Sequence, residues 1–187
     1  MKNYLLFGFL FFAICFTNEL VAQVDLKVNP IGILFKNPEL AGEISFDENI
    51  SIEAAAGLKY GGLDFLGANF ESKGYSFRVS PRYYFNPEMG TDNFYGGLYA
   101  RYTAQNFTTS VANLEGDFDR KKLALGFLTG YKWVGNSGVL LDINAGLGRK
   151  IINKTTSENF NEVELNSLPL INIDLLATIA IGYRIGK

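Results

Sequence analysis

Two carboxylates, Glu43 and Glu53, have the residue type and spacing that acid–base chemistry needs. If residues 47–49 form a three-residue hairpin turn, Phe46 faces Ile50 and Glu43 falls directly opposite Glu53. Two carboxyl groups side by side can serve as a general acid and base or as a proton path. Like charges that face each other are unfavourable, however, so a cation that bridges them is the commoner arrangement.

Nearby arginines can supply that cation. The stretch "GYSFRVSPRYYF" at residues 74–85 alternates between apolar and polar positions, with Arg78 and Arg82 on the polar face. In an extended chain, successive side chains point to opposite faces of the sheet. The planar guanidinium forks suit two-point contacts with carboxylates. We therefore favour structural ion pairing over catalysis for Glu43 and Glu53.

Further charges recur on the polar faces of other segments. Lys132 and Asp142 flank the turn "GNSG" and form a second expected pair. Four more charges fall where the first and last strands would meet: Asp25, Lys27, Asp174 and Arg184. Because an isolated buried charge is costly, we expect an ion-pair network in the interior. Its expected members are Glu43, Glu53, Lys59, Arg78, Arg82, Arg101, Lys132, Asp142, Asp174 and Arg184.

The composition excludes several kinds of chemistry. The chain has no histidine, which removes Ser-His-Asp hydrolysis, histidine-based metal sites and the commonest general base. The formal net charge of −2 gives no basic surface for nucleic-acid phosphates. We expect no enzyme activity, no cofactor, no metal and no nucleic-acid partner.

The first 22 residues have the layout of a secretory signal peptide. Lys2 precedes an apolar run at residues 4–16, and the segment ends on the small residue Ala22. The run is short for a membrane-spanning helix. We predict cleavage after Ala22, which leaves a mature domain at residues 23–187 without cysteine. A lipid-modified Cys15 is the rival interpretation, but the residue before it is not the small one expected there.

Period-two alternation of apolar and polar residues recurs through the mature chain and predicts an all-β domain. Eight segments show it: residues 24–35, 39–46, 50–60, 74–85, 94–106, 122–134, 139–151 and 172–186. A strand crosses a bilayer at a tilt with about 9–11 residues, and all eight segments are about that long, the second only marginally. A sheet without covering helices must close, because an open edge invites aggregation. We therefore predict a closed eight-stranded antiparallel up-and-down transmembrane β-barrel.

Short and long connections alternate along the chain. The connections "DEN", "NPEMGTDN" and "GNSG" are short and turn-like, whereas residues 61–73, 107–121 and 152–171 are long. Only "KNP", after the first segment, breaks the rule. Short turns at one end and long loops at the other are typical of outer-membrane barrels.

The two faces of the strands differ in a way that indicates which is outside. Glycine and alanine share the polar face with long charged residues, as a narrow interior requires, whereas glycine on an exposed face would only weaken a strand. Aromatic residues gather near the strand ends of the apolar face, as in the girdles at lipid headgroup level. The expected lipid-facing aromatics are Tyr60, Tyr75, Phe77, Tyr83, Phe85, Tyr102, Tyr131, Trp133 and Tyr183. A soluble lipocalin-like barrel would instead turn its apolar residues inward, among them Phe77, Tyr83, Leu125 and Ile179.

Four stretches carry a family resemblance: "SPRYYFNP" (80–87), "FYGGLYARY" (94–102), "LALGFLTGYKWV" (123–134) and "GVLLDINAGLGR" (138–149). In these, the chain resembles the small outer-membrane β-barrel proteins of Gram-negative bacteria, in particular a family of unknown function. The resemblance implies a barrel in the outer membrane and carries over no functional residue. Many such barrels end in an aromatic residue that the assembly machinery reads, whereas this sequence ends "GYRIGK", with Tyr183 as the nearest equivalent.

The leading expectation is an outer-membrane barrel with a charge-plugged interior. Its role would be structural or one of recognition, through the three long outer loops. The expected partners are outer-membrane lipid, the barrel assembly machinery and an unidentified extracellular ligand. Two alternatives remain at this point: a soluble carrier of an apolar ligand, and a small pore with unpaired interior charges.

Overall fold

The computed structural model describes residues 23–34, 36–65, 68–111, 114–157, 160–164 and 172–186. The predicted signal peptide and Cys15 lie outside these residues. The described part contains nine strands and one short helix. None of the helices described is long and apolar enough to cross a membrane.

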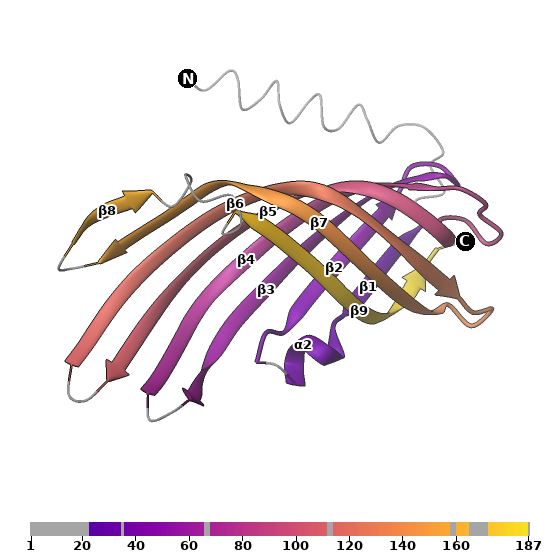
Figure 1. Cartoon of the computed structure of the whole chain (residues 1–187). Helices are drawn as coiled ribbons and strands as arrows, with labels where there is room; N and C mark the ends of the chain where they lie inside the picture. The colour runs from indigo at the N-terminus through magenta and orange to yellow at the C-terminus, as the bar shows by residue number, and fades with distance from the viewer. Residues whose placement is uncertain are drawn as a thin grey trace, which may run out of the picture.

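Eight of the strands close into a ring (Figure 1). In chain order they are β1 (Val24–Val28), β2 (Glu39–Ser45), β3 (Ile50–Phe65), β4 (Ala68–Tyr84), β5 (Asn93–Val111), β6 (Leu114–Val134), β7 (Val139–Ser157) and β9 (Ile173–Ile185). Each pairs antiparallel with the next, and β9 returns to pair with β1. The short β8 (Phe160–Glu164) pairs with β7 beside the ring. The fold is thus a closed eight-stranded up-and-down barrel, as the alternation predicts.

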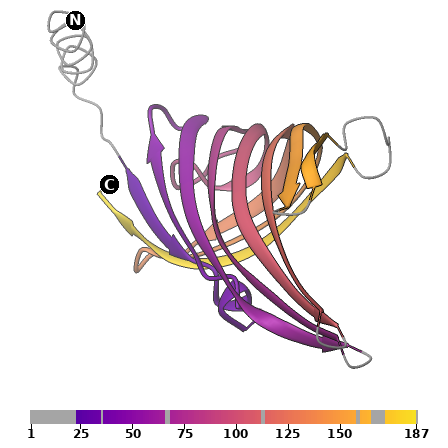
Figure 2. The ribbon, with the colours of Figure 1, turned by 90° about the vertical axis from the view of Figure 1, so that its left-hand side faces the viewer.

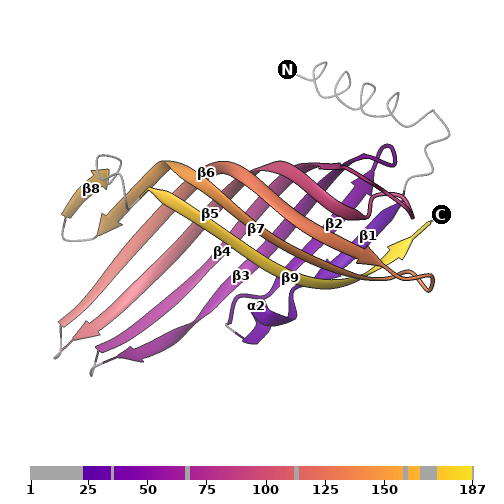
Figure 3. The ribbon, with the colours of Figure 1, turned by 45° about the vertical axis from the view of Figure 1, so that its right-hand side comes forward.

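The three segments that the sequence predicts as long loops are largely strand. β3 and β4 stay paired as far as Phe65 and Ala68, and β5 and β6 as far as Val111 and Leu114. β7 reaches residue 157 and is followed by β8. These hairpins extend to the end of the barrel opposite the short turns and the C-terminus (Figure 3); we call it the distal end, and the other the proximal end. Their sequences lack a continuous apolar face, which is why alternation does not indicate them.

The first strand is shorter than the sequence predicts. β1 ends at residue 28, and residues 30–34 form a short helix, α2 (Pro30–Leu34). Pro30 has no N–H for a strand ladder, and its fixed φ suits a first helical turn. Asn29 Oδ1 accepts a hydrogen bond from Gly32 N at 2.9 Å, as an N-cap residue does. The connection between β1 and β2 therefore covers residues 29–38, and the apparent exception to the loop rule disappears.

Two irregularities interrupt the strand ladders of the eight-stranded ring. β4 pairs with β5 at Val79 and again at Arg82, in the same register on both sides of Pro81. Because proline lacks an N–H donor, Pro81 leaves a gap in this pairing; a bulge or register shift, which a proline inside a strand would predict, does not occur. A register shift does occur between β6 and β7, next to Leu123, where Ile151 is the extra residue.

The apolar face of the barrel is the outer one. Phe77, Tyr83 and Leu125 are 54%, 50% and 48% exposed, whereas Arg78 and Arg82 are 3% and 2% exposed. The alternative of a lipocalin-like carrier, in which these apolar residues would face inward, is therefore wrong. The buried apolar cluster inside the barrel is small and consists of Tyr84, Tyr95, Tyr99, Leu128 and Leu176.

Candidate functional site

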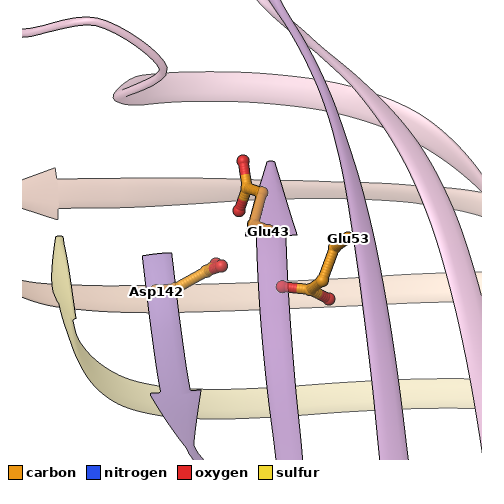
Figure 4. A group of neighbouring side chains, drawn as sticks. All are labelled: Glu43, Glu53 and Asp142. Atoms are coloured by element: carbon orange, nitrogen blue, oxygen red, sulfur yellow. The ribbon is translucent and has the colours of Figure 1, made fainter. Parts of the chain in front are cut away.

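Lys27 lies at the centre of a buried group of carboxylates. Its Nζ atom is 2.5 Å from Glu43 Oε2 and 2.6 Å from both Glu53 Oε2 and Asp142 Oδ2. The three carboxylates converge from β2, β3 and β7 (Figure 4), with oxygens within 4.8 Å of one another. Glu43 stands directly opposite Glu53, as the three-residue turn predicts. An ammonium group has three N–H donors, so Lys27 can give one to each carboxylate.

Arg82 adds a second cation to the same carboxylates. Its Nη1 atom is 2.7 Å from Asp142 Oδ2, and its Nη2 atom contacts Glu53 Oε1. Arg78, four residues earlier on the same face, lies nearer the rim of the group. Its Nη2 atom is 2.6 Å from Glu39 Oε1 and 3.4 Å from Glu53 Oε1. The two carboxylates that face each other are thus bridged by one arginine together with Lys27, which comes from β1.

Lys132 has partners other than the one its register suggests. It stands directly opposite Asp142 in the pairing of β6 with β7. Its Nζ atom, however, is 2.7 Å from Asp25 Oδ2 and 2.9 Å from Glu43 Oε1. Arg184 makes a two-point contact with Asp25, at 2.7 Å from Nε to Oδ1 and 2.9 Å from Nη2 to Oδ2. In a barrel this narrow, a long side chain reaches across the interior as easily as to its neighbour.

The turn between β4 and β5 covers the proximal side of these ion pairs. Thr91, in this turn, is fully buried. Its Oγ1 atom is 2.7 Å from Ser45 Oγ and accepts a hydrogen bond from Lys132 Nζ at 3.3 Å. Arg184 Nη2 donates to the Thr91 carbonyl oxygen at 2.8 Å. The sequence indicates a short turn here but not that it folds into the barrel mouth.

Tyrosine rings occupy much of the remaining interior. Tyr84, Tyr95 and Tyr99 are at most 2% exposed. Tyr95 Oη donates a hydrogen bond to Asp142 Oδ1 at 2.6 Å. A Cβ atom added at Gly130 would stand 2.6 Å from Tyr95 Oη, so this glycine leaves room for the ring. The expected small interior residues therefore accommodate buried tyrosines as well as charges; the alternation places these tyrosines on the polar face but does not indicate their role.

The remaining predicted interior charges lie nearer the distal end. Arg101 Nη2 contacts Asp174 Oδ1, and Tyr99 Oη donates to Asp174 Oδ2 at 2.9 Å. Lys59 Nζ donates to Gln105 Oε1 at 3.3 Å. Asp174 therefore belongs with these residues, and not with the charges where β9 meets β1.

The nine aromatic side chains predicted to face lipid fall into two groups on the outer face, and Phe127, which is 74% exposed, lies between them. The proximal group consists of Tyr83, Phe85, Tyr131, Trp133 and Tyr183, which are 50–53% exposed. The distal group consists of Tyr60, Tyr75, Phe77 and Tyr102, of which the first three are 45–54% exposed. Tyr102 is half-buried and packs beside Tyr75, with 6.4 Å between ring centroids.

The interior charges form a compensated group that we call the central ion cluster. It contains five carboxylates (Asp25, Glu39, Glu43, Glu53 and Asp142) and five cations (Lys27, Arg78, Arg82, Lys132 and Arg184). The spacing of three of its carboxylates would suit a divalent cation, but the Lys27 ammonium lies between them. An acid–base role needs a carboxylate that can reach substrate, whereas the side chains of Glu43 and Glu53 are at most 3% exposed and held by cations. Ion pairing is the chemistry that this arrangement supports.

One protein family and two solved structures are similar to this chain. No curated protein matches the chain. In structure, the chain is similar to Neisserial surface protein A (NspA), with a TM-score of 0.41 and 15% identity over 89% of this chain and 96% of that chain. It is also similar to a major outer membrane protein from Thermus thermophilus, with a TM-score of 0.45 and 13% identity over 88% and 99% of the two chains. The family model described as "Protein of unknown function (DUF3575)" matches residues 6–166, and the chain belongs to that family.

Proposed function

We propose that the protein is an integral outer-membrane barrel of a Gram-negative bacterium, with an interior closed by ion pairs and a distal end that recognises a partner outside the membrane. The observation that carries this proposal is the outer face, to which every strand of the ring contributes exposed apolar side chains. One per strand suffices to show it: Leu26 53%, Leu40 65%, Leu58 59%, Phe77 54%, Leu98 52%, Phe127 74%, Leu147 60% and Leu175 71% exposed. Soluble monomers rarely leave so large an apolar surface in water.

The separation of the two aromatic groups supports a bilayer setting. On β4 and the turn that follows it, Tyr75 and Phe85 face outward ten positions apart. With a rise of about 3.4 Å per residue and a tilt of about 40°, they are about 26 Å apart along the barrel axis. The apolar band of outer-membrane barrels is about 25 Å tall and has aromatic girdles at both edges. Outer-membrane lipid is therefore the partner proposed for this face, and the barrel assembly machinery is the partner proposed for insertion.

The filled interior favours a closed barrel over a pore. A pore needs a water path lined by unpaired charges, whereas the central ion cluster pairs its carboxylates with an equal number of cations. Three buried tyrosines and the turn that contains Thr91 fill space around the cluster. We therefore assign the protein a non-catalytic and non-conducting role.

The distal hairpins are the parts proposed for recognition. β5 continues nine positions beyond Tyr102, to Val111. At the same rise and tilt, that is about 23 Å beyond the distal aromatic group. Paired strands hold this extension as a framework that a flexible loop would not provide.

Electrophoresis of the refolded mature chain tests the proposal. A closed membrane barrel is expected to need detergent for solubility and to migrate differently before and after boiling, because its strands resist unfolding in the detergent until heated. A monomer that stays folded in plain buffer and shows no shift would contradict the proposal.

A further inference from the structure

The inner wall of the distal half of the barrel carries an excess of positive charge. The charged residues concerned come from five strands. Each is itself buried or lies an even number of positions from a buried residue of the same strand, so its side chain faces inward. They are Lys59, Arg101, Arg120, Lys122, Lys150 and Asp174. Lys150 has an interaction of its own; the other described charges that face inward at this level are four cations and one carboxylate, which gives a formal charge of +3. Strand pairing brings these cations together: Lys122 stands opposite Thr103, two positions from Arg101, and Arg120 stands opposite Gln105, to which Lys59 donates a hydrogen bond.

Two of these cations, Lys59 and Arg120, have neutral hydrogen-bond partners, unlike the cations of the central ion cluster. Lys59 donates to the neutral amide oxygen of Gln105 at 3.3 Å, and Arg120 Nε donates to the neutral amide oxygen of Asn153 at 3.0 Å. Asp174 contacts Arg101 and also accepts a hydrogen bond from Tyr99. Neutral amides satisfy donors but do not offset charge. Repulsion among the cations therefore favours a bound anion.

The group is also accessible from the distal end. Lys59, Arg101, Arg120 and Lys122 are half-buried, so they are partly desolvated without being sealed. β3 to β6 run well past β1 and β2 (Figure 2). β2 begins at Glu39, opposite Gly57 of β3, and the connection before it stays hydrogen-bonded to β3 as far as Tyr60, at 3.0 Å from Tyr60 N to the Lys36 carbonyl oxygen. A ligand can approach the cationic wall from the distal end, past the edge of this connection.

We propose that the inner wall formed by Lys59, Arg101, Arg120 and Lys122 binds a ligand that carries two phosphate groups. Guanidinium and ammonium donors are the usual partners of phosphate oxygens. Two phosphate groups carry about three to four negative charges at neutral pH, which matches the net charge of the wall. The proposal rests on the recognition role proposed above and names its ligand class; the source is either a phosphorylated lipid headgroup or a soluble phosphate compound.

Titration of the refolded full mature chain with pyrophosphate, in zwitterionic detergent at low salt, tests the site. Saturable binding at one site per chain is expected. Lys122→Gln with Arg120→Gln removes two of the donors and is expected to weaken binding by at least about ten-fold. Lys121→Gln is the matched control, because Lys121 is the intervening residue and is exposed on the other face of β6. Absence of saturable binding, or an equal loss in the control, would overturn the proposal.

Two further measurements separate loss of binding from loss of folding. The mobility shift on boiling reports whether each variant is folded. Lys59→Gln is a milder change, since it removes only a hydrogen bond to an amide, and it is expected to weaken pyrophosphate binding without abolishing the mobility shift. Competition with detergent micelles that contain cardiolipin, a lipid whose headgroup carries two phosphate groups, distinguishes the sources: displacement of pyrophosphate indicates a lipid headgroup, and indifference indicates a soluble ligand. If the original chain shows no mobility shift on boiling but still binds pyrophosphate, the proposal of a membrane barrel is wrong and the proposed binding site is supported.

Discussion

Removal of the Lys27 ammonium is the sharpest perturbation of the central ion cluster. Lys27→Met keeps most of the side-chain length but removes the ammonium that lies within 2.6 Å of Glu43, Glu53 and Asp142. Breaking a buried ion pair by removing one partner costs roughly 3–5 kcal/mol. Because Arg82 still contacts all three carboxylates, we expect a loss in free energy of unfolding near the lower end of that range.

The assay is equilibrium unfolding in urea of the refolded barrel in lipid vesicles, followed by the fluorescence of Trp133, the single tryptophan of the chain. Lys121→Met, at an exposed position, is the control and is expected to change the free energy of unfolding by less than about 0.5 kcal/mol. Adding Asp142→Asn to Lys27→Met removes one uncompensated charge and is expected to recover part of the loss. A Lys27→Met barrel within about 1 kcal/mol of the original protein would refute the reasoning, since that is below the cost of an unpaired buried charge.

Two further predictions concern the filling of the interior. Gly130→Val places a side chain where an added Cβ is 2.6 Å from Tyr95 Oη, and overpacking of this kind costs about 1–3 kcal/mol; Gly96→Val, where the nearest atom is 3.6 Å away, is the control, and equal unfolding curves for the two variants would count against a filled interior. In planar bilayers the protein is expected to conduct no ions, whereas Arg82→Ser with Asp142→Ser, which truncates an ion pair that lies 2.7 Å apart without changing net charge, is expected to admit a small current. A steady current from the unaltered barrel would argue for the pore instead.

Local periodicity made the ring of strands and its faces predictable. A strand that is half-buried must alternate, so Phe77 and Arg78 could be assigned to opposite faces from their positions in the sequence. The pairing of Glu43 with Glu53 followed from the length of one turn, because a hairpin turn fixes the register of its two strands.

The details of the cluster depended on information that alternation does not contain. Lys27 reaches three carboxylates because β1 closes the ring between β2 and β9, and side-chain reach across a narrow interior decides that Lys132 contacts Asp25. The distal hairpins could not be predicted for a different reason. Strand residues beyond the apolar outer face need not alternate between apolar and polar types, so the sequence of the paired strand at residues 107–111 resembles that of a loop. The helix at Pro30 was open to prediction, since an Asn–Pro pair is a helix-start signal.

The depth of Trp133 in a bilayer tests the central claim most directly. Trp133 is 53% exposed on the outer face, in the proximal aromatic group. In vesicles of lipids brominated at different chain positions, its fluorescence is expected to be quenched most by bromines near the headgroup. In a Trp133→Phe background, Phe127→Trp is expected to be quenched most by bromines near the chain ends, because Phe127 is 74% exposed and lies six positions, or about 16 Å along the barrel axis, from residue 133. Quenching in that order supports a lipid-facing barrel; no quenching at either position would contradict it.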